Sequence, residues 1–226
     1  MDVDVRLDAL LRGGFLACLD GAQQGALLDA GHLIELVAGQ PLGPRVADGA
    51  VMVMLAGLLR IYLAAPSGRQ VTVRYARPGE VVGLVHLVGA KTAVHAQAID
   101  PVMLFAFPGR QIEALAQTHA AFALAIAREC ADRTVDAMDE LRLVTFGSVR
   151  QRLARHLLDL AAGHVDGRLL AAVTQQELAD AAGTVREVVA RALKEMRADG
   201  LIGESEAGIV LLDPRRLDDE SAGRVT

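Results

Sequence analysis

The chain has 226 residues, of which 52% are hydrophobic, and a formal net charge of −5. This length is enough for one large or two small domains with a substantial core. No run of about 18 or more apolar residues is free of charge, and the first residues are acidic instead of basic, so neither a membrane-spanning helix nor a secretory signal is predicted. The expected location is therefore the cytoplasm.

The two cysteines, Cys18 and Cys130, form neither a CxxC motif nor a Cys/His cluster. This pattern gives no support to a disulfide framework, a structural zinc site or a four-cysteine iron–sulfur cluster. We expect each cysteine to pack as a small apolar residue and predict no metal site.

The acidic net charge argues against nucleic-acid binding when it is taken alone. Its distribution changes that argument, because residues 147–217 hold equal numbers of basic and acidic residues and the excess acid lies elsewhere. All but two of the 23 basic residues are arginine, the better partner for phosphates and guanine edges. The positions of the charges must therefore decide the question.

Residues 22–108 alternate short apolar runs with glycine and proline, which is typical of short strands joined by turns. Turn signals at roughly ten-residue spacing favour an antiparallel sandwich or a small barrel. The Ala- and Leu-rich residues 7–28 are expected to form short helices ahead of it, and PSGR at 66–69 a hairpin loop. The expected strand regions are 32–39, 49–64, 70–79, 92–99 and 101–108.

Residues 109–146 are expected to be helical, since no glycine or proline lies between Gln111 and Phe146. Small or apolar residues recur there at alternating three- and four-residue steps, the heptad period of a helix that pairs with another helix. The small residues and the flanking charges favour a dimer seam; a helix packed on its own domain is the alternative. The seam residues are Leu124, Ala127, Ala131, Thr134, Met138 and Leu141.

From Gly147 the pattern predicts a further domain. A helix at 148–162 is expected to bury Val149, Leu153, Leu157 and Leu160, followed by a break at 163–167 and a short strand at 168–173. The end of this region reads as a hairpin, with strands at 200–204 and 209–212 and a turn through 206–208.

Between them lie two short helices joined by a glycine turn. Thr174 with Glu177, and Thr184 with Glu187, each fit a capping box, and Gly183 suits the tight turn between the helices. A helix-turn-helix followed by a hairpin predicts a winged helix that binds double-stranded DNA.

In a helix-turn-helix the second helix enters the major groove. Val189, Leu193 and Met196 form its predicted inward face, which leaves an outward face that includes Ala190 and three charged residues. Arginine binds guanine and glutamate accepts from cytosine, so this face suits a G·C-containing half-site; the alternative is an ordinary solvated face. We expect Gln175, Gln176 and the helix amide ends to hold phosphates. The predicted DNA-binding residues are Thr174, Gln175, Gln176, Thr184, Arg186, Glu187 and Arg191.

The pattern T-x-Q-E-L-A…G-x-x-R-E-x-V-x-R-x-L-K at 174–194, followed by GLI at 200–202, resembles the CRP/FNR (catabolite activator/fumarate–nitrate regulator) family of bacterial transcription factors. The resemblance implies an α+β fold: a cyclic-nucleotide-binding-like β-roll with N-terminal helices (1–108), a dimerisation helix (109–146), a winged helix-turn-helix (147–217) and a tail (218–226). It also implies that Arg186, Glu187 and Arg191 read bases. Val185 and Val188 depart from the family, which often has hydroxyl residues there, and this departure predicts a weaker phosphate grip.

The same resemblance suggests an effector site in a G-E-x-x-G…R-S/T-A cassette. A carboxylate there takes a ribose hydroxyl, and a cation with backbone amides takes a phosphate. The usual arginine is replaced by Lys91, and the usual hydroxyl pair on the dimer helix by Ala137 and Met138. Cyclic AMP is therefore disfavoured against another small ligand or none, and haem held by His86 or His95 is also disfavoured. The candidate effector residues are Gly79, Glu80, Gly83, Lys91, Thr92 and Thr134.

No G-x-S-x-G, P-loop or HExxH motif is present, so no enzyme is predicted. The favoured hypothesis is a homodimeric, sequence-specific transcription regulator with an atypical ligand pocket. Its expected partners are palindromic double-stranded DNA and a second copy of the chain, with RNA polymerase as a further candidate. The rival hypothesis is a ligand-sensing β-roll whose winged helix contacts other proteins.

Overall fold

A computed structural model describes residues 6–7, 11–43, 49–89 and 94–224. The chain separates into two units: the first is made of residues 1–61 and 73–137, the second of residues 62–72 and 138–226.

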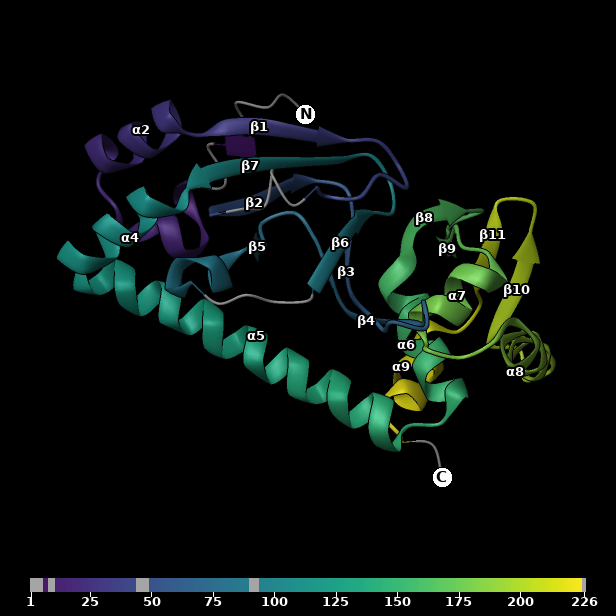
Figure 1. Ribbon diagram of the computed structural model, residues 1–226. Helices are drawn as coiled ribbons and strands as arrows, with labels where there is room; N and C mark the ends of the chain where they lie inside the picture. The colour runs from purple at the N-terminus through teal and green to yellow at the C-terminus, as the bar shows by residue number, and fades with distance from the viewer. Residues whose placement is uncertain (1–5, 8–10, 44–48, 90–93, 225–226) are drawn as a thin grey trace. The chain divides into compact units, whose positions relative to one another are not determined.

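The first unit is built on an antiparallel sheet in the order β1-β7-β2-β5. Figure 1 shows β1, β7 and β2 running side by side. Successive side chains of a strand point to opposite faces, and β2 is apolar on both. Val51, Val53 and Leu55 join one core, whereas Met52 and Met54 join a second core on the other face. The bounds are β1 His32–Leu36, β2 Ala50–Ala56, β5 Val81–Val82 and β7 Val102–Pro108.

Short helices precede this sheet, as the sequence predicts. They are the 3₁₀ helix η1, Gly14–Cys18, and α2, Gly21–Ala30. Both cysteines are exposed, however, so the prediction that they pack as apolar residues is wrong. Cys18 lies at the end of η1, where its Sγ donates to the carbonyl of Phe15 at 3.1 Å and is not covered by the core.

A second sheet has the order β4-β3-β6, with β3 Leu59–Ala64, β4 Gln70–Ala76 and β6 Val94–Ala98. The predicted hairpin loop at 66–69 is confirmed, because the amide of Ala65 donates to the carbonyl of Arg69 at 2.8 Å. The short strand β5 and the 3₁₀ helix η2, Leu84–Val88, follow β4.

The helical region after β7 contains two helices, not the single helix expected over 109–146. They are α4, Gly109–Thr118, and α5, Ala120–Phe146. His119 between them has extended backbone angles (φ −124°, ψ 96°). The break lets Ile112 of α4 and Phe122 of α5, both fully buried, enter the same core. The sequence carries no signal for this break, since a histidine is an ordinary helix residue.

The second unit contains the predicted helix-turn-helix and hairpin within a four-stranded sheet of order β10-β11-β9-β8. The segment expected to be a break, 163–167, instead lies mostly in a strand that pairs with β9. The bounds are α6 Val149–Leu160, β8 Ala161–Val165, β9 Arg168–Ala171, α7 Gln175–Ala181, α8 Arg186–Ala198, β10 Ile202–Ser205, β11 Gly208–Leu211 and α9 Pro214–Ser221.

The core of this unit lies between α6 and the helices packed on it. Leu153 and Leu157 of α6 are fully buried as predicted, while Val149 is only half-buried. The expected tail also differs, because residues up to Ser221 belong to α9 and Leu217 of that helix is fully buried. Arg150 of α6 pairs with Glu220 of α9, which fastens the two helices.

Within the described residues, no helix is both long enough and apolar enough to cross a membrane.

Candidate nucleic-acid interface

The first helix of the helix-turn-helix begins with the predicted capping box. The Thr174 hydroxyl accepts from the Glu177 amide at 3.2 Å, and the Glu177 carboxylate accepts from the Thr174 amide at 2.7 Å. Two amides that would lack a partner at a helix start are thereby satisfied. The turn that follows is also as predicted: Gly183 has φ +63°, a left-handed conformation that favours glycine.

The second predicted capping box is wrong. The N-cap of α8 is Val185 (φ −115°, ψ 153°), and no side chain caps the helix there. Thr184 lies one residue too early, where its amide donates to the carbonyl of Ala179 as part of the turn. The helix start therefore leaves its first amides free of a side-chain cap, next to a valine that is 56% exposed.

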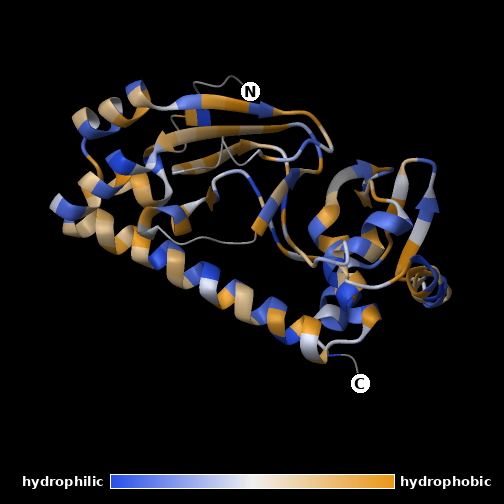
Figure 2. Cartoon of the chain, in the orientation of Figure 1, coloured by the Kyte–Doolittle hydropathy of each residue, from blue (hydrophilic) through white to orange (hydrophobic). Residues whose placement is uncertain are grey.

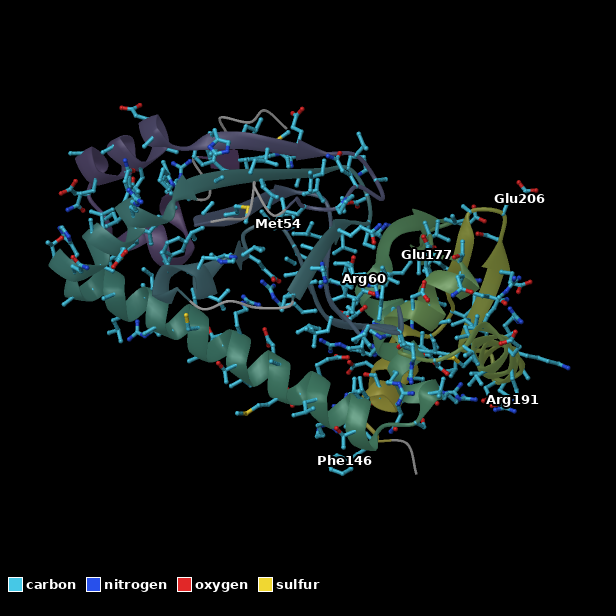
Figure 3. All side chains as sticks on the ribbon, viewed as in Figure 1. Met54, Arg60, Phe146, Glu177, Arg191 and Glu206 are labelled. Carbon is cyan, nitrogen blue, oxygen red and sulfur yellow. The ribbon has the colours of Figure 1, made fainter. Side chains whose placement is uncertain are left out.

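The two faces of α8 are divided as the sequence predicts. Val189, Leu193 and Met196 are fully buried, together with Ala192. Arg186, Glu187 and Arg191 are exposed. Figure 3 shows the side chain of Arg191 extending away from α8. This helix therefore presents two arginines and a glutamate on its open side.

A groove of about 560 Å³ runs between the two helices and the hairpin. It brings together Thr174, Gln175, Gln176 and Arg186, four of the predicted DNA-binding residues. Glu187 and Arg191 do not line it; they lie on the exposed side of α8.

The groove also includes residues that sequence reasoning missed. Arg197 of α8 forms an ion pair with Glu204 of β10, and Ser205 lies at the end of that strand. The hydroxyl of Ser205 donates to the carbonyl of Gly208 across the hairpin at 3.2 Å. The sequence did hold a signal for this ion pair: a basic residue in the last turn of α8 is followed by an acidic residue in the first wing strand.

The hairpin, or wing, formed by β10 and β11 is acidic. Its residues 202–211 contain Glu204 and Glu206 and no lysine or arginine. Glu206 lies at the exposed tip, as Figure 3 shows. Since the wing contains no lysine or arginine, it offers no cation of its own to a phosphate. Arg197 of α8 pairs with one of its two glutamates, Glu204.

The predicted seam residues of α5 all lie on the surface of the chain. Leu124, Met138 and Leu141 are 52%, 63% and 64% exposed, and the smaller members are exposed as well. Figure 2 shows hydrophobic and hydrophilic bands alternating along this helix. Thr134 directs its hydroxyl to the carbonyl of Cys130 in its own helix, at 2.8 Å. The chain itself therefore does not cover these seam residues, although Phe122, Ala125 and Ile126 of the same helix do pack in the core of the first unit.

The candidate effector carboxylate is already engaged. Glu80 accepts from Arg74 at 2.6 Å, and its Oε2 lies 3.4 Å from Nη1 of Arg133 of α5. Arg133 also pairs with Asp136, at 2.9 Å. Burial lowers the pKa of Arg74, nearby Arg133 lowers it further, and Glu80 opposes both effects. Glu80 thus serves as the counter-charge of two arginines.

The other candidate effector residues are only partly brought together. Gly83 has φ +92°, and a side chain there would lie 2.5 Å from the carbonyl of Ala50, so glycine is required for the backbone path. A cavity of about 280 Å³ in this unit has Gly79 on its wall but neither Glu80 nor Gly83. Lys91 and Thr92 lie outside the described residues. In the part of the chain that the structure describes, no three metal-ligating side chains gather to form a metal site.

A β-roll followed by a long helix and a winged helix-turn-helix defines a class of two-domain DNA-binding regulators. Residues 45–119 match the cyclic nucleotide-binding domain, and residues 151–220 match the Crp-like helix-turn-helix domain. The chain belongs to the CRP/FNR family of transcriptional regulators.

Relatives and solved structures agree with this assignment. The chain is 33% identical to the transcriptional regulator LdrP of Thermus thermophilus, over 73% of this chain and 84% of the relative. It is 30% identical to the transcriptional regulator SdrP of the same organism, over 86% and 93%. The crystal structure of a CRP-family regulator from Thermus thermophilus matches with a TM-score of 0.70 at 26% identity, over 84% of this chain and 96% of that chain. These relatives are transcription regulators and not enzymes.

Proposed function

We propose that this protein is a homodimeric, sequence-specific DNA-binding transcription regulator. The observation that carries the proposal is the open face of α8, where Arg186, Glu187 and Arg191 are exposed while the opposite face is buried. Arginine donates two parallel hydrogen bonds to guanine, and glutamate accepts from cytosine, so this set reads a G·C-containing half-site.

Phosphate contacts position the protein on the duplex. Gln175 and Gln176 line the groove beside Arg186, and the uncapped start of α8 offers backbone amides. The acidic wing contributes no cation. The grip on the DNA backbone therefore depends on α7 and α8 more than on the hairpin, and Thr184 acts through the turn and not as a cap.

Dimerisation is supported by the exposed apolar face of α5. A contiguous row of apolar residues on a helix surface marks an interaction site, and the heptad period matches a second copy of the same helix. Two recognition helices in such a dimer occupy successive major grooves, which predicts a palindromic operator with half-sites about 34 Å apart.

The ion pairs of Glu80 argue against cyclic AMP as the effector. A ribose hydroxyl would have to compete with Arg74 and Arg133 for this carboxylate. One relative, 29% identical over 68% of this chain and 70% of the relative, is a cyclic AMP receptor protein, which makes the nucleotide the natural probe. Isothermal titration of cyclic AMP into the purified protein should give no binding; saturable binding would contradict this part of the proposal.

The rival function, a winged helix that contacts proteins, draws support from the wing's acidic charge. Selection of bound sequences from a random double-stranded pool separates the two hypotheses, since only a DNA reader enriches a palindrome. In the enriched site, Arg186→Ala should cost about 1–3 kcal/mol and relax specificity at one base pair. If Arg186→Ala still discriminates between bases at every position of the site, the assignment of Arg186 as a base-reading residue is refuted. Contact with RNA polymerase stays a prediction.

A further inference from the structure

Arg152 of α6 joins the ends of two other helices. Its Nη1 donates to the carbonyl of Gly147 at 2.8 Å, and its Nε donates to the carbonyl of Ala182 at 3.0 Å. Gly147 is the residue that follows α5, and Ala182 is the C-cap of α7. All three residues, and the last turns of α5 from Met138, belong to the second unit. One guanidinium therefore contacts both the end of the long helix and the turn of the helix-turn-helix.

Both acceptors are carbonyls at or just beyond helix ends, where no further helical amide follows to satisfy them. The planar guanidinium carries several donors in a rigid fork and stays charged, so it reaches two acceptors at once. Lysine is a point charge on a flexible stem and cannot reproduce this geometry. Burial lowers the pKa of Arg152, and Glu140 of α5 opposes the shift.

Apolar packing holds the junction between the end of α5 and the start of α6 only in part. Leu143 of α5 is buried, but Phe146, the last residue of that helix and labelled in Figure 3, is 84% exposed. The backbone at the junction is tight, since a side chain at Gly147 would lie 2.4 Å from the carbonyl of Leu143. Because the turn at Gly147 has little apolar cover, directional hydrogen bonds determine how α5 and the helices after it are oriented to each other.

We propose that Arg152 is a positioning residue that fixes the helix-turn-helix relative to the last turns of α5, and thereby sets the half-site spacing that the dimer accepts. The inference rests on the proposed function, since spacing has meaning only for a dimer on a palindrome. Arg152 touches no base; it acts through the turn that precedes α8.

The test compares full-length Arg152→Gln and Arg152→Lys with wild type. Arg155→Gln is the matched control, because Arg155 is exposed on the same helix and pairs with Asp159 of that helix at 3.1 Å. Affinity is measured on the selected palindrome, on versions with the spacer changed by one base pair in each direction, and on a single half-site. Melting temperature is recorded for each variant.

Wild type and the Arg155 variant should prefer one spacer. Arg152→Gln should lose that preference by on the order of tenfold, which is roughly the contribution of one hydrogen bond to a charged group, while its affinity for the single half-site stays within about twofold. Arg152→Lys should fall between them. Retained spacer preference in Arg152→Gln overturns the inference, as does an equal loss of affinity on every DNA together with a lower melting temperature. Failure of wild type to bind any palindrome would refute the proposed function itself.

Discussion

Removal of one exposed leucine from the seam should weaken the dimer strongly. Leu141→Ala removes three apolar groups, each contributing about 0.8 kcal/mol when buried. Leu141 is 64% exposed in the single chain, so about 1.5 kcal/mol per chain is available to dimerisation. Two chains lose about 3 kcal/mol, which is on the order of a hundredfold in the dimer dissociation constant.

Sedimentation equilibrium over a dilution series measures this constant. Leu33→Ala is the matched control, because Leu33 is also an exposed leucine, at 37%, but belongs to β1 and not to α5. The control should dimerise like wild type. An unchanged dissociation constant for Leu141→Ala, or equal weakening by both variants, would refute the assignment of the α5 face as the dimer interface.

Three further outcomes are expected. Thr174→Ala should lower the free energy of unfolding, measured by urea denaturation, by about 0.5–2 kcal/mol, because it removes the cap of α7. Thr184→Ala should change it little, because Thr184 caps no helix, and equal effects of the two variants would contradict the observed caps. Glu80→Gln should destabilise by about 1–3 kcal/mol, because Arg74 loses its charged partner, while Asp139→Asn, whose carboxylate is 75% exposed and pairs with Arg142 within α5, should be nearly neutral; a neutral Glu80 variant would show that the pair does not stabilise the fold. Burial, and then the charge of Asp159, raise the pKa of Glu140 from 4.5 to about 7. The carboxyl of the unfolded chain keeps the lower pKa, so the folded state binds the proton more tightly, and the free energy of unfolding of wild type should fall as pH rises from about 4.5 to about 7. Glu140→Gln should lose less over the same range. Parallel pH profiles of melting temperature for the two proteins would count against the raised pKa.

The sequence-based predictions succeeded where a local rule and the fold demand the same residue. Thr174 with Glu177 sits at a true helix start, and the spacing of Val189, Leu193 and Met196 reproduces the buried face of α8. The heptad residues of α5 are exposed, as a seam requires, while their role as a dimer interface stays a prediction. In each case the pattern of residue types extends over several positions, so few alternative local conformations fit it.

The failures have physical causes that no local rule contains. Thr184 satisfies the capping pattern, but the turn needs one more extended residue, so Val185 takes the cap position. His119 interrupts a sequence with good helical propensity because Ile112 and Phe122 must share a core. Residues 163–165 extend a strand because β9 offers them backbone partners. Tertiary packing overrides local preference at each of these points.

The exposed face of α8 was predicted from the sequence, but its surroundings were not. Arg186, Glu187 and Arg191 follow from the helical period of α8. The pairing of Arg197 with Glu204, and the two hydrogen bonds of Arg152, join residues from different elements and have no short-range signature. The engagement of Glu80 by Arg133, 53 residues further along the chain, is of the same kind.

Binding of the protein to its selected palindrome as a function of salt tests the central claim most directly. Each neutralised phosphate releases a counterion, so affinity falls linearly on logarithmic axes. With several phosphates contacted by each dimer, we predict a loss on the order of a hundredfold between about 50 and 200 mM salt, with the palindrome favoured over a scrambled duplex throughout. Equal affinity for both duplexes, or affinity that does not change with salt, would contradict the account.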